Sequence, residues 1–212
     1  MNQELTKRIL SSIILLPITF FLIIEGSFLF IIFIIICFFI SVYEWNNISK
    51  KNKYNKIGYI FIFFSFLSIY NLRINIVDDS IFLLIVIICI STDIGGYIFG
   101  KVFRGPKLTI YSPNKTFAGM LGSFIFSILF MFIFIKYYDA PEPSIKIVLF
   151  ILIISFISQL GDIIVSYFKR LANVKDTGNI IPGHGGLLDR TDGMLFVFPF
   201  SNIIILTNFF NV

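Results

Sequence analysis

Residues Gly26–Tyr43 read GSFLFIIFIIICFFISVY, a stretch without a single charged side chain. Phe and Ile dominate it, which is the composition of a helix that is solvated by lipid. The whole chain of 212 residues is 57% hydrophobic and only 14% charged, whereas soluble domains are about one-quarter charged. The sequence therefore predicts an integral membrane protein.

Six other charge-free runs surround this stretch, and together they predict seven helices. A helix needs about 20 residues to cross about 30 Å of hydrocarbon, so we expect the shorter runs to extend into adjoining polar residues, past Asp93 to Gly100 and past Asp162 to about Phe168. The fold class is an all-α polytopic membrane protein with about seven transmembrane helices. We expect one integral membrane domain, 1–212, with N-terminal helices in 1–91 and a catalytic portion in 92–212. The predicted spans are Ile9–Ile24, Gly26–Tyr43, Ile57–Leu72, Ser80–Thr92, Thr116–Ile135, Ile147–Gly161 and Gly193–Val212.

The basic residues are divided unequally between the two ends of these seven helices. With the N-terminus inside, the outer loops hold only Arg73, Lys136 and Lys146, and the other 14 of the 17 basic residues lie in inner segments. Cytoplasmic loops carry this kind of excess, so we expect a cytoplasmic N-terminus and polar loops on the cytoplasmic side. The same rule accounts for the net charge of +5 without a nucleic-acid partner.

Candidate functional residues are concentrated in residues 159–193, which read QLGDIIVSYFKRLANVKDTGNIIPGHGGLLDRTDG. Asp162 and Ser166 are four residues apart, and Lys169 and Arg170 follow on the same helical face. This face could offer a carboxylate, a hydroxyl and two cations to one ligand, because ionisable groups at the end of a membrane helix are usually functional. The alternative is a polar face that points to water.

Asp189 and Asp192 lie at the start of the last predicted span. They could cap the helix, since carboxylates favour a helix N-terminus. They could instead hold Mg²⁺, which is commonly bound by one or two carboxylates together with substrate phosphates. Arg190 between them could meet a phosphate or pair with an aspartate.

The sequence Pro182-Gly183-His184-Gly185-Gly186 contains three glycines and the only histidine of the chain. The glycines permit unusual backbone angles and a close approach of N–H groups to an anion. We expect Gly183, Gly185 and Gly186 to bind substrate and His184 to donate to a phosphate or to shuttle a proton.

A second polar cluster spans Thr92 to Gly122, where Asp93 interrupts a predicted helix. Gly96 and Gly100 are four apart, which is typical of close helix packing. The segment Ser112-Pro113-Asn114-Lys115-Thr116 precedes a helix and could present a cation, a hydroxyl and a helix N-terminus to phosphate. We expect Ser112, Lys115, Thr116 and Asp93 to contribute to substrate binding.

These motifs resemble the signature of the phosphatidate cytidylyltransferases, also called CDP-diacylglycerol synthases. The matching positions include Ser166, Lys169-Arg170, Lys175-Asp176, Pro182 to Gly186, Asp189-Arg190 and Asp192. Asp93-x-Gly95-Gly96-Tyr97-x-x-Gly100 and the Ser112–Gly119 segment are similar to a second conserved region of that family. The resemblance extends from about Thr92 to the C-terminus, and the N-terminal part is shorter than in many members.

The resemblance implies transfer of CMP from CTP to phosphatidate, giving CDP-diacylglycerol and pyrophosphate. It implies a divalent metal, usually Mg²⁺, on Asp162, Asp189 and Asp192, a second, monovalent cation such as K⁺, and a homodimer. Since repulsion among phosphates limits such a reaction, we expect Lys169, Arg170, Lys175 and Arg190 to bind phosphate oxygens. Asp176 and His184 complete the predicted catalytic set, and Ser166 is a further substrate-binding candidate.

Two other functions remain open. A related lipid enzyme, such as a polyprenol kinase or a CDP-archaeol synthase, would use similar chemistry on another lipid. A transporter would need polar groups near the middle of the bilayer, whereas here they gather toward one face. The expected location is the cytoplasmic membrane, as a multi-pass protein, and the bias toward Ile, Asn, Lys and Phe indicates a bacterium with an AT-rich genome.

Overall fold

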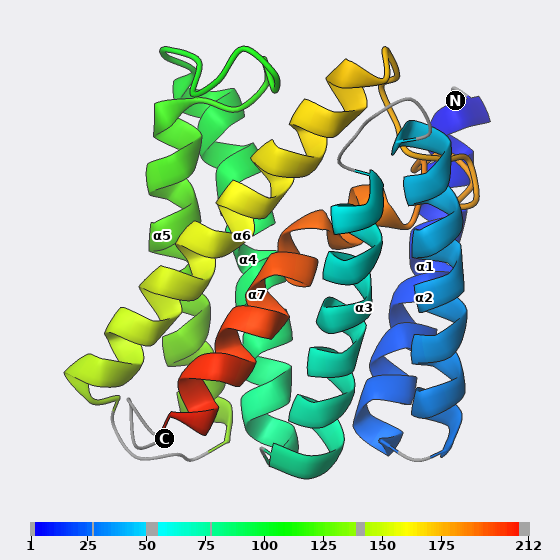
Figure 1. Cartoon of the computed structure of the whole chain (residues 1–212). Helices are drawn as coiled ribbons and strands as arrows, with labels where there is room; N and C mark the ends of the chain where they lie inside the picture. Colours follow the sequence, from blue (N-terminus) through cyan, green and yellow to red (C-terminus); the bar gives the residue numbers. More distant parts are fainter. Residues whose placement is uncertain (1–2, 27, 50–54, 77, 139–142, 208–212) are drawn as a thin grey trace.

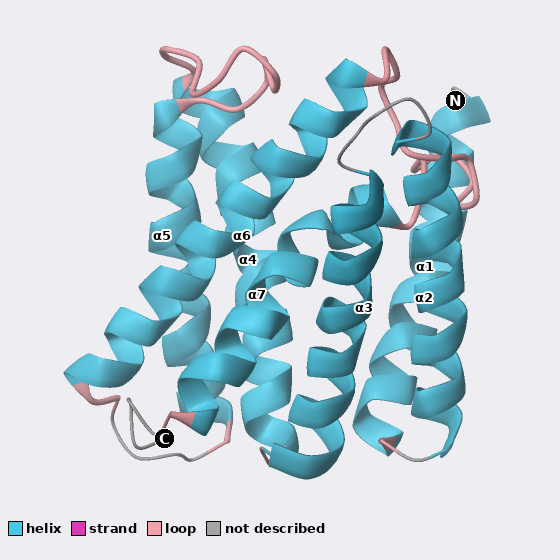
Figure 2. Cartoon of the chain, in the orientation of Figure 1, coloured by secondary structure: helices cyan, strands magenta, loops and turns pink. Residues whose placement is uncertain are grey.

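The computed structural model of the chain describes residues 3–26, 28–49, 55–76, 78–138 and 143–207. Within these ranges it consists of helices joined by loops and contains no β-strand (Figure 2). The prediction of an all-α protein is confirmed. Three parts of the sequence predictions lie outside the described residues, namely Ser27 of the second span, 208–212 of the last span, and Lys50, Lys51 and Lys53 of an inner loop.

Each predicted span corresponds to one helix, with bounds that differ by one or two residues at most ends. The last helix differs most from the prediction, because it begins at Leu188 rather than at Gly193 and so includes Asp189 and Asp192. The third helix continues into a π-helical turn, Leu72–Ile76. The α-helices are α1 Gln3–Glu25, α2 Phe28–Ser49, α3 Asn55–Asn71, α4 Asp79–Phe103, α5 Phe117–Tyr137, α6 Ile145–Leu171 and α7 Leu188–Leu206.

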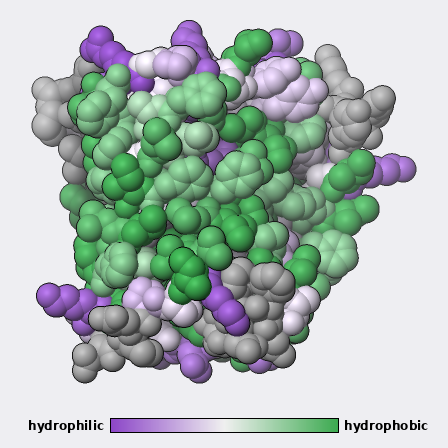
Figure 3. All heavy atoms as spheres, turned by 90° about the vertical axis from the view of Figure 1, so that its left-hand side faces the viewer, coloured by the Kyte–Doolittle hydropathy of each residue, from purple (hydrophilic) through white to green (hydrophobic). Residues whose placement is uncertain are grey.

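Five of these helices are long and apolar enough to cross a membrane: α2, α3 with its π-helical turn, α4, α5 and α6. The apolar part of α1 is shorter, Ile13–Glu25, and α7 begins with three charged side chains in its first five residues. Apolar side chains form a broad band around the middle of one face, with polar ones toward both ends (Figure 3). The chain is a multi-pass membrane protein.

The helices alternate in direction, so that the polar loops gather at one end of the bundle. Figure 1 shows the start of α1, the 104–116 loop and the 172–187 loop at the same end, which we call the polar end. The last turn of α7 and the first turns of α4 and α6 lie at the opposite end (Figure 1). The two polar clusters of the sequence are therefore brought to the same end of the molecule.

Helices α4 and α5 pack closely because glycines face each other across their contact. A Cβ atom on Gly119 would lie 2.8 Å from the carbonyl oxygen of Gly96, and one on Gly122 would lie 2.8 Å from that of Gly95. A Cβ on Gly100 would lie 3.3 Å from Thr116 Oγ1. The predicted packing role of Gly96 and Gly100 is confirmed, and this close approach places Asp93 and Lys115 beside the same space.

Candidate functional site

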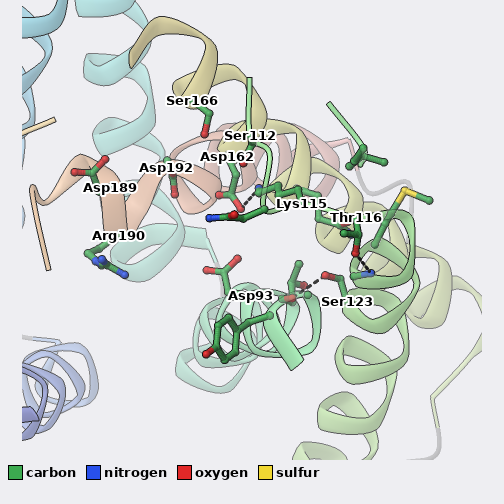
Figure 4. A pocket seen from close by; sticks show the side chains of 18 residues that line it. Asp93, Ser112, Lys115, Thr116, Ser123, Asp162, Ser166, Asp189, Arg190 and Asp192 are labelled. Carbon is green, nitrogen blue, oxygen red and sulfur yellow. Dashed lines mark hydrogen bonds and ion pairs between the residues drawn. The ribbon is translucent and has the colours of Figure 1, made fainter. Parts of the chain in front are cut away.

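A cavity of about 340 Å³ opens between α4, α5, α6 and the start of α7, toward the polar end. Both polar clusters predicted from the sequence contribute to its walls (Figure 4). Of the predicted site residues, those that line it are Asp93, Ser112, Lys115, Thr116, Asp162, Ser166, Asp189, Arg190 and Asp192.

Three aspartates on three different helices point into the cavity. Asp162 of α6 and Asp192 of α7 lie side by side, and Asp93 of α4 faces them across the space (Figure 4). The Asp162 and Asp192 carboxyl groups are close enough to interact directly. One carboxylate oxygen, Asp162 Oδ1, is buried and has no hydrogen-bond partner within the described part of the chain.

The pairing of Asp162 with Asp192 follows from a close crossing of α6 and α7. A Cβ on Gly161 would lie 2.9 Å from the carbonyl oxygen of Asp192, and one on Gly193 would lie 3.0 Å from both Asp162 Oδ1 and the carbonyl oxygen of Ser158. Two glycines, each adjacent in sequence to one of the aspartates, therefore let the backbones approach. Any larger side chain at either position would separate the two carboxylates.

Two cationic side chains, Lys115 and Arg190, also line the cavity. Lys115 Nζ lies 2.5 Å from Asp162 Oδ2, so it partly balances the acidic group. Arg190 is held by the carbonyl oxygen of His184, to which its Nη2 donates at 2.6 Å and its Nε at 3.2 Å. The cavity can thus present both carboxylate oxygens and cations to a ligand that carries phosphates and a metal ion.

Asp189 and Lys169 lie close together, but their charged groups bind each other. Lys169 Nζ donates to Asp189 Oδ1 at 2.8 Å, and their side chains are 11% and 5% exposed. Asp189 Oδ2 accepts from the backbone N–H of Thr177 at 2.8 Å and from that of Gly186 at 2.9 Å, and the Thr177 hydroxyl oxygen lies 3.0 Å away. Lys169 is absent from the cavity lining, so the pair fastens the 172–187 loop to α6 and α7.

The Pro182–Gly186 segment forms a tight turn outside the cavity. Ile181 N donates to the Gly185 carbonyl at 2.9 Å, and Gly183 and Gly185 adopt φ angles of 76° and 90° that favour glycine. The anion that this turn approaches is the Asp189 carboxylate, through Gly186 N. His184 Nδ1 lies 2.9 Å from Ser11 Oγ, and Ser11 also donates to the Pro182 carbonyl at 3.0 Å.

Three further predicted residues lie outside the cavity lining: Arg170, Lys175 and Asp176. Arg170 is exposed and donates to the carbonyl oxygens of Tyr111 at 3.2 Å and Val174 at 3.1 Å. It thereby ties the 104–116 loop to the end of α6. Lys175 and Asp176 are exposed on the 172–187 loop.

The arrangement fits a metal ion that shares its coordination with a substrate. Across the described ranges, no group of three or more His, Cys, Asp or Glu side chains is disposed to enclose a metal by itself. Mg²⁺ commonly takes only one or two carboxylates from the protein and completes its octahedron with phosphates and water. Asp162, with an unpartnered oxygen, and the adjacent Asp192 supply that number.

Sequence reasoning missed several polar residues of this region. Thr92, Asn114, Ser123 and Gln159 line the cavity, and Ser123 Oγ donates to the Thr92 carbonyl at 2.7 Å. The most important omission is Glu44 of α2, which is fully buried and bonded to the start of α7. Its only signal in the sequence was a carboxylate next to the single tryptophan at the end of an apolar run.

Comparison with known proteins agrees with these motifs. The sequence model of the cytidylyltransferase family matches residues 6–90 and 59–208. Phosphatidate cytidylyltransferases of Staphylococcus haemolyticus and Bacillus subtilis are 42% and 44% identical over 116 residues, and that of Staphylococcus aureus (strain COL) is 43% identical over 117. Each alignment covers 54% of this chain and 43–45% of the relative, so the chain spans somewhat less than half the length of the relatives it matches.

Proposed function

This chain belongs to the cytidylyltransferase family, and we propose that it transfers the cytidylyl group of CTP to phosphatidate, forming CDP-diacylglycerol and pyrophosphate. The observation that carries the proposal is a cavity in which Asp93, Asp162 and Asp192 lie together with Lys115 and Arg190. The named relatives at 42–44% identity are phosphatidate cytidylyltransferases. A cavity with both signs of charge suits two phosphate-bearing substrates and a divalent cation.

In the proposed reaction, an oxygen of the phosphatidate phosphate attacks the α-phosphorus of CTP. The new O–P bond forms while the bond from the α-phosphorus to the bridging oxygen breaks, and pyrophosphate leaves with that electron pair. The nucleophile is already an anion, so the site needs no side chain to remove a proton from it. The main requirement is to bring two anions together, which fixed positive charges favour.

Lys115 and Arg190 are the cations best placed to bind the substrate phosphates and reduce their mutual repulsion. Arg190 is fixed by the carbonyl oxygen of His184, and Lys115 exchanges its ion pair with Asp162 for a substrate phosphate. Ser112, Thr116 and Ser166 offer hydroxyl groups along the same walls. Thr116 also caps α5, since its Oγ1 accepts from Gly119 N at 3.1 Å, and this aims the N-terminus of α5 at the cavity.

Mg²⁺ is the proposed cofactor, and Asp162 and Asp192 are the residues that would hold it, with Asp93 opposite. When bound, it would neutralise charge on the reacting phosphates. The further prediction that Asp189 is a ligand stays a prediction. In the structure, one of its oxygens accepts two backbone hydrogen bonds and the other pairs with Lys169. A second, monovalent cation and a homodimer also stay predictions.

The diacyl tails of phosphatidate would remain in lipid while its head group enters the cavity. This places CTP, a soluble nucleotide, at the polar end, which we propose faces the cytoplasm. The excess of basic residues in the segments assigned to that side supports this orientation. We propose seven spans in the cytoplasmic membrane of a bacterium, with α1 and α7 crossing together with the five long apolar helices.

The test is incubation of the purified chain with labelled CTP, phosphatidate and Mg²⁺, followed by lipid extraction. We expect label from the cytidine moiety in the lipid phase, and loss of that signal when a chelator is added. Parallel reactions with a polyprenol or an archaeal ether lipid as acceptor separate the related enzymes. Label transferred from the γ-phosphate of CTP or ATP to a polyprenol, with none from cytidine, would replace the proposal by a kinase.

A further inference from the structure

Glu44 is a carboxylate at the polar end of α2 that no motif of the proposed site includes. It is 0% exposed, and burying a carboxylate is costly unless it is well hydrogen-bonded. Its partners all come from a distant part of the chain. Oε1 accepts from Leu187 N at 3.0 Å, Oε2 accepts from Leu188 N at 2.8 Å, and the Thr177 hydroxyl oxygen lies 3.0 Å from Oε2.

These contacts give α7 the N-terminal cap that its own sequence lacks. Leu187 occupies the N-cap position and makes no side-chain cap bond, so the first N–H groups of α7 need acceptors from elsewhere. Glu44 supplies them from another helix, and its negative charge lies at the positive end of the helix dipole. This explains why α7 begins at Leu188 and so carries Asp189 and Asp192 in its first turns.

The Thr177 hydroxyl links Glu44 to the site. Its Oγ1 lies 3.0 Å from Glu44 Oε2 and 3.0 Å from Asp189 Oδ2, so its one proton can be donated to either carboxylate. Asp189 in turn pairs with Lys169 of α6. A continuous chain of contacts therefore runs from α2 through the 172–187 loop to α7 and α6, whose aspartates line the cavity.

Two glycines of the loop leave the space that Glu44 fills. A Cβ on Gly178 would lie 2.7 Å from Glu44 Oε1, and one on Gly186 would lie 2.5 Å from Oε2. Trp45, the next residue, packs edge-on against Phe168 of α6 at a ring-centroid distance of 5.0 Å. Consecutive residues of α2 thus contact α7 and α6, the two helices that carry Asp192 and Asp162.

We infer that Glu44 is a positioning residue for the proposed reaction: it holds the 172–187 loop and the start of α7 so that Asp192 meets Asp162 in the cavity. The expected effect of Glu44 on the reaction rate rests on the proposed function. Its expected effect on the 172–187 loop rests on the hydrogen bonds alone. It also assigns the N-terminal helices a part in building the site.

The experiment compares Glu44→Gln and Thr177→Val with Ser49→Ala in the full chain. Ser49 is a matched control, because it is buried on the same helix at the same end, and its hydrogen bonds to described residues go to Trp45 and Asn55. Glutamine keeps the size of Glu44 but turns an NH₂ group toward backbone donors. Thr177→Val removes only the hydroxyl that lies between the Glu44 and Asp189 carboxylates. It therefore tests the same link if Glu44→Gln does not fold.

We expect kcat to fall about tenfold or more in Glu44→Gln, and less in Thr177→Val, at a temperature where all variants are folded. We expect kcat to fall by a larger factor than the KM for CTP rises, because Asp192 and Arg190 follow the loosened segment, whereas Lys115 belongs to the 104–116 loop and keeps its contact with Asp162. Backbone amides of 177–188 should exchange hydrogen faster in both variants, and Ser49→Ala should match the wild type in kcat and in that exchange.

Unchanged exchange in 177–188, or a loss of activity that only follows the unfolded fraction, would overturn the inference. The two proposals fail in different ways. A wild-type chain without cytidylyl transfer would refute the proposed function, and the hydrogen-exchange comparison would still decide whether Glu44 positions the loop.

Discussion

Asp189 and Asp192 look equivalent in the sequence, because both stand at the start of one helix and either could cap it or hold a metal ion. In the structure their surroundings differ. The Asp189 carboxylate accepts from Lys169, Thr177 and Gly186, whereas Asp192 lies beside Asp162 and accepts from its neighbour Gly193 N at 3.1 Å. Both line the cavity, but only Asp189 is also bonded to the 172–187 loop.

We therefore expect the two asparagine substitutions to separate stability from activity. Asp192→Asn should lower cytidylyl transfer by about 100-fold or more and should leave the unfolding midpoint unchanged or raised, because it removes repulsion with Asp162. Asp189→Asn should cost about 3–5 kcal/mol of stability, since it leaves the buried Lys169 without its partner. Thermal unfolding in detergent and initial rates on the folded protein measure both effects; equal destabilisation by the two variants would contradict the distinction.

At the scale of elements, proline within α7 is compensated by its neighbour α3. Pro199 has no N–H, so the carbonyl oxygen of Leu195, four residues earlier, loses its helical donor. The buried Ser65 Oγ of α3 lies 2.7 Å from that oxygen and 2.9 Å from the Phe61 carbonyl oxygen of its own helix, so its one proton can be donated to the Leu195 carbonyl. Backbone groups that a proline frees inside a membrane must find such partners.

A double-mutant cycle tests this compensation. Ser65→Ala should destabilise the chain by about 1 kcal/mol, because the Leu195 carbonyl is left unpaired. In a Pro199→Ala background, residue 199 donates to that carbonyl and the cost of Ser65→Ala should shrink. Unfolding midpoints of the four proteins give the coupling, and strictly additive shifts would show that the serine does not serve the proline.

At the scale of the whole molecule, the polar side chains at the two ends of the bundle have different roles. The polar end holds the cavity, whereas the opposite end is closed by Arg73, which donates to the carbonyl oxygens of Ile23 and Ile24 at the end of α1 and pairs with Asp79 at the start of α4. Arg73 is one of the three basic residues assigned to the outer side, and it is buried because these contacts join α1 to α4.

Labelling of single cysteines tests the proposed orientation. Lys107 and Lys146 are exposed and lie at opposite ends, and the native Cys37 and Cys89 are replaced by alanine. We expect a membrane-impermeant maleimide to label Lys146→Cys in intact cells and Lys107→Cys only after the cytoplasmic membrane is permeabilised. Labelling of Lys107→Cys in intact cells would reverse the topology. Lys146→Cys should keep wild-type activity, since it lies far from the cavity.

The sequence by itself determined that the chain is helical, which segment forms each helix to within a few residues, and which segments carry polar chemistry. Those properties follow from local composition, because a helix in lipid satisfies its own backbone and displays an apolar surface. Asp93, Lys115, Asp162 and Asp192 could be chosen from their motifs, and the structure brings all four to one cavity.

Only the tertiary structure decided what each polar residue contacts. It placed Lys169 on Asp189 rather than in the cavity lining, and it joined Glu44 to Leu188, 144 residues away. The α6–α7 crossing at Gly161 and Gly193 and the burial of Glu44 arise from packing between helices. The periodicity of one segment carries no information about its partner, so these contacts were beyond the reach of motif and composition.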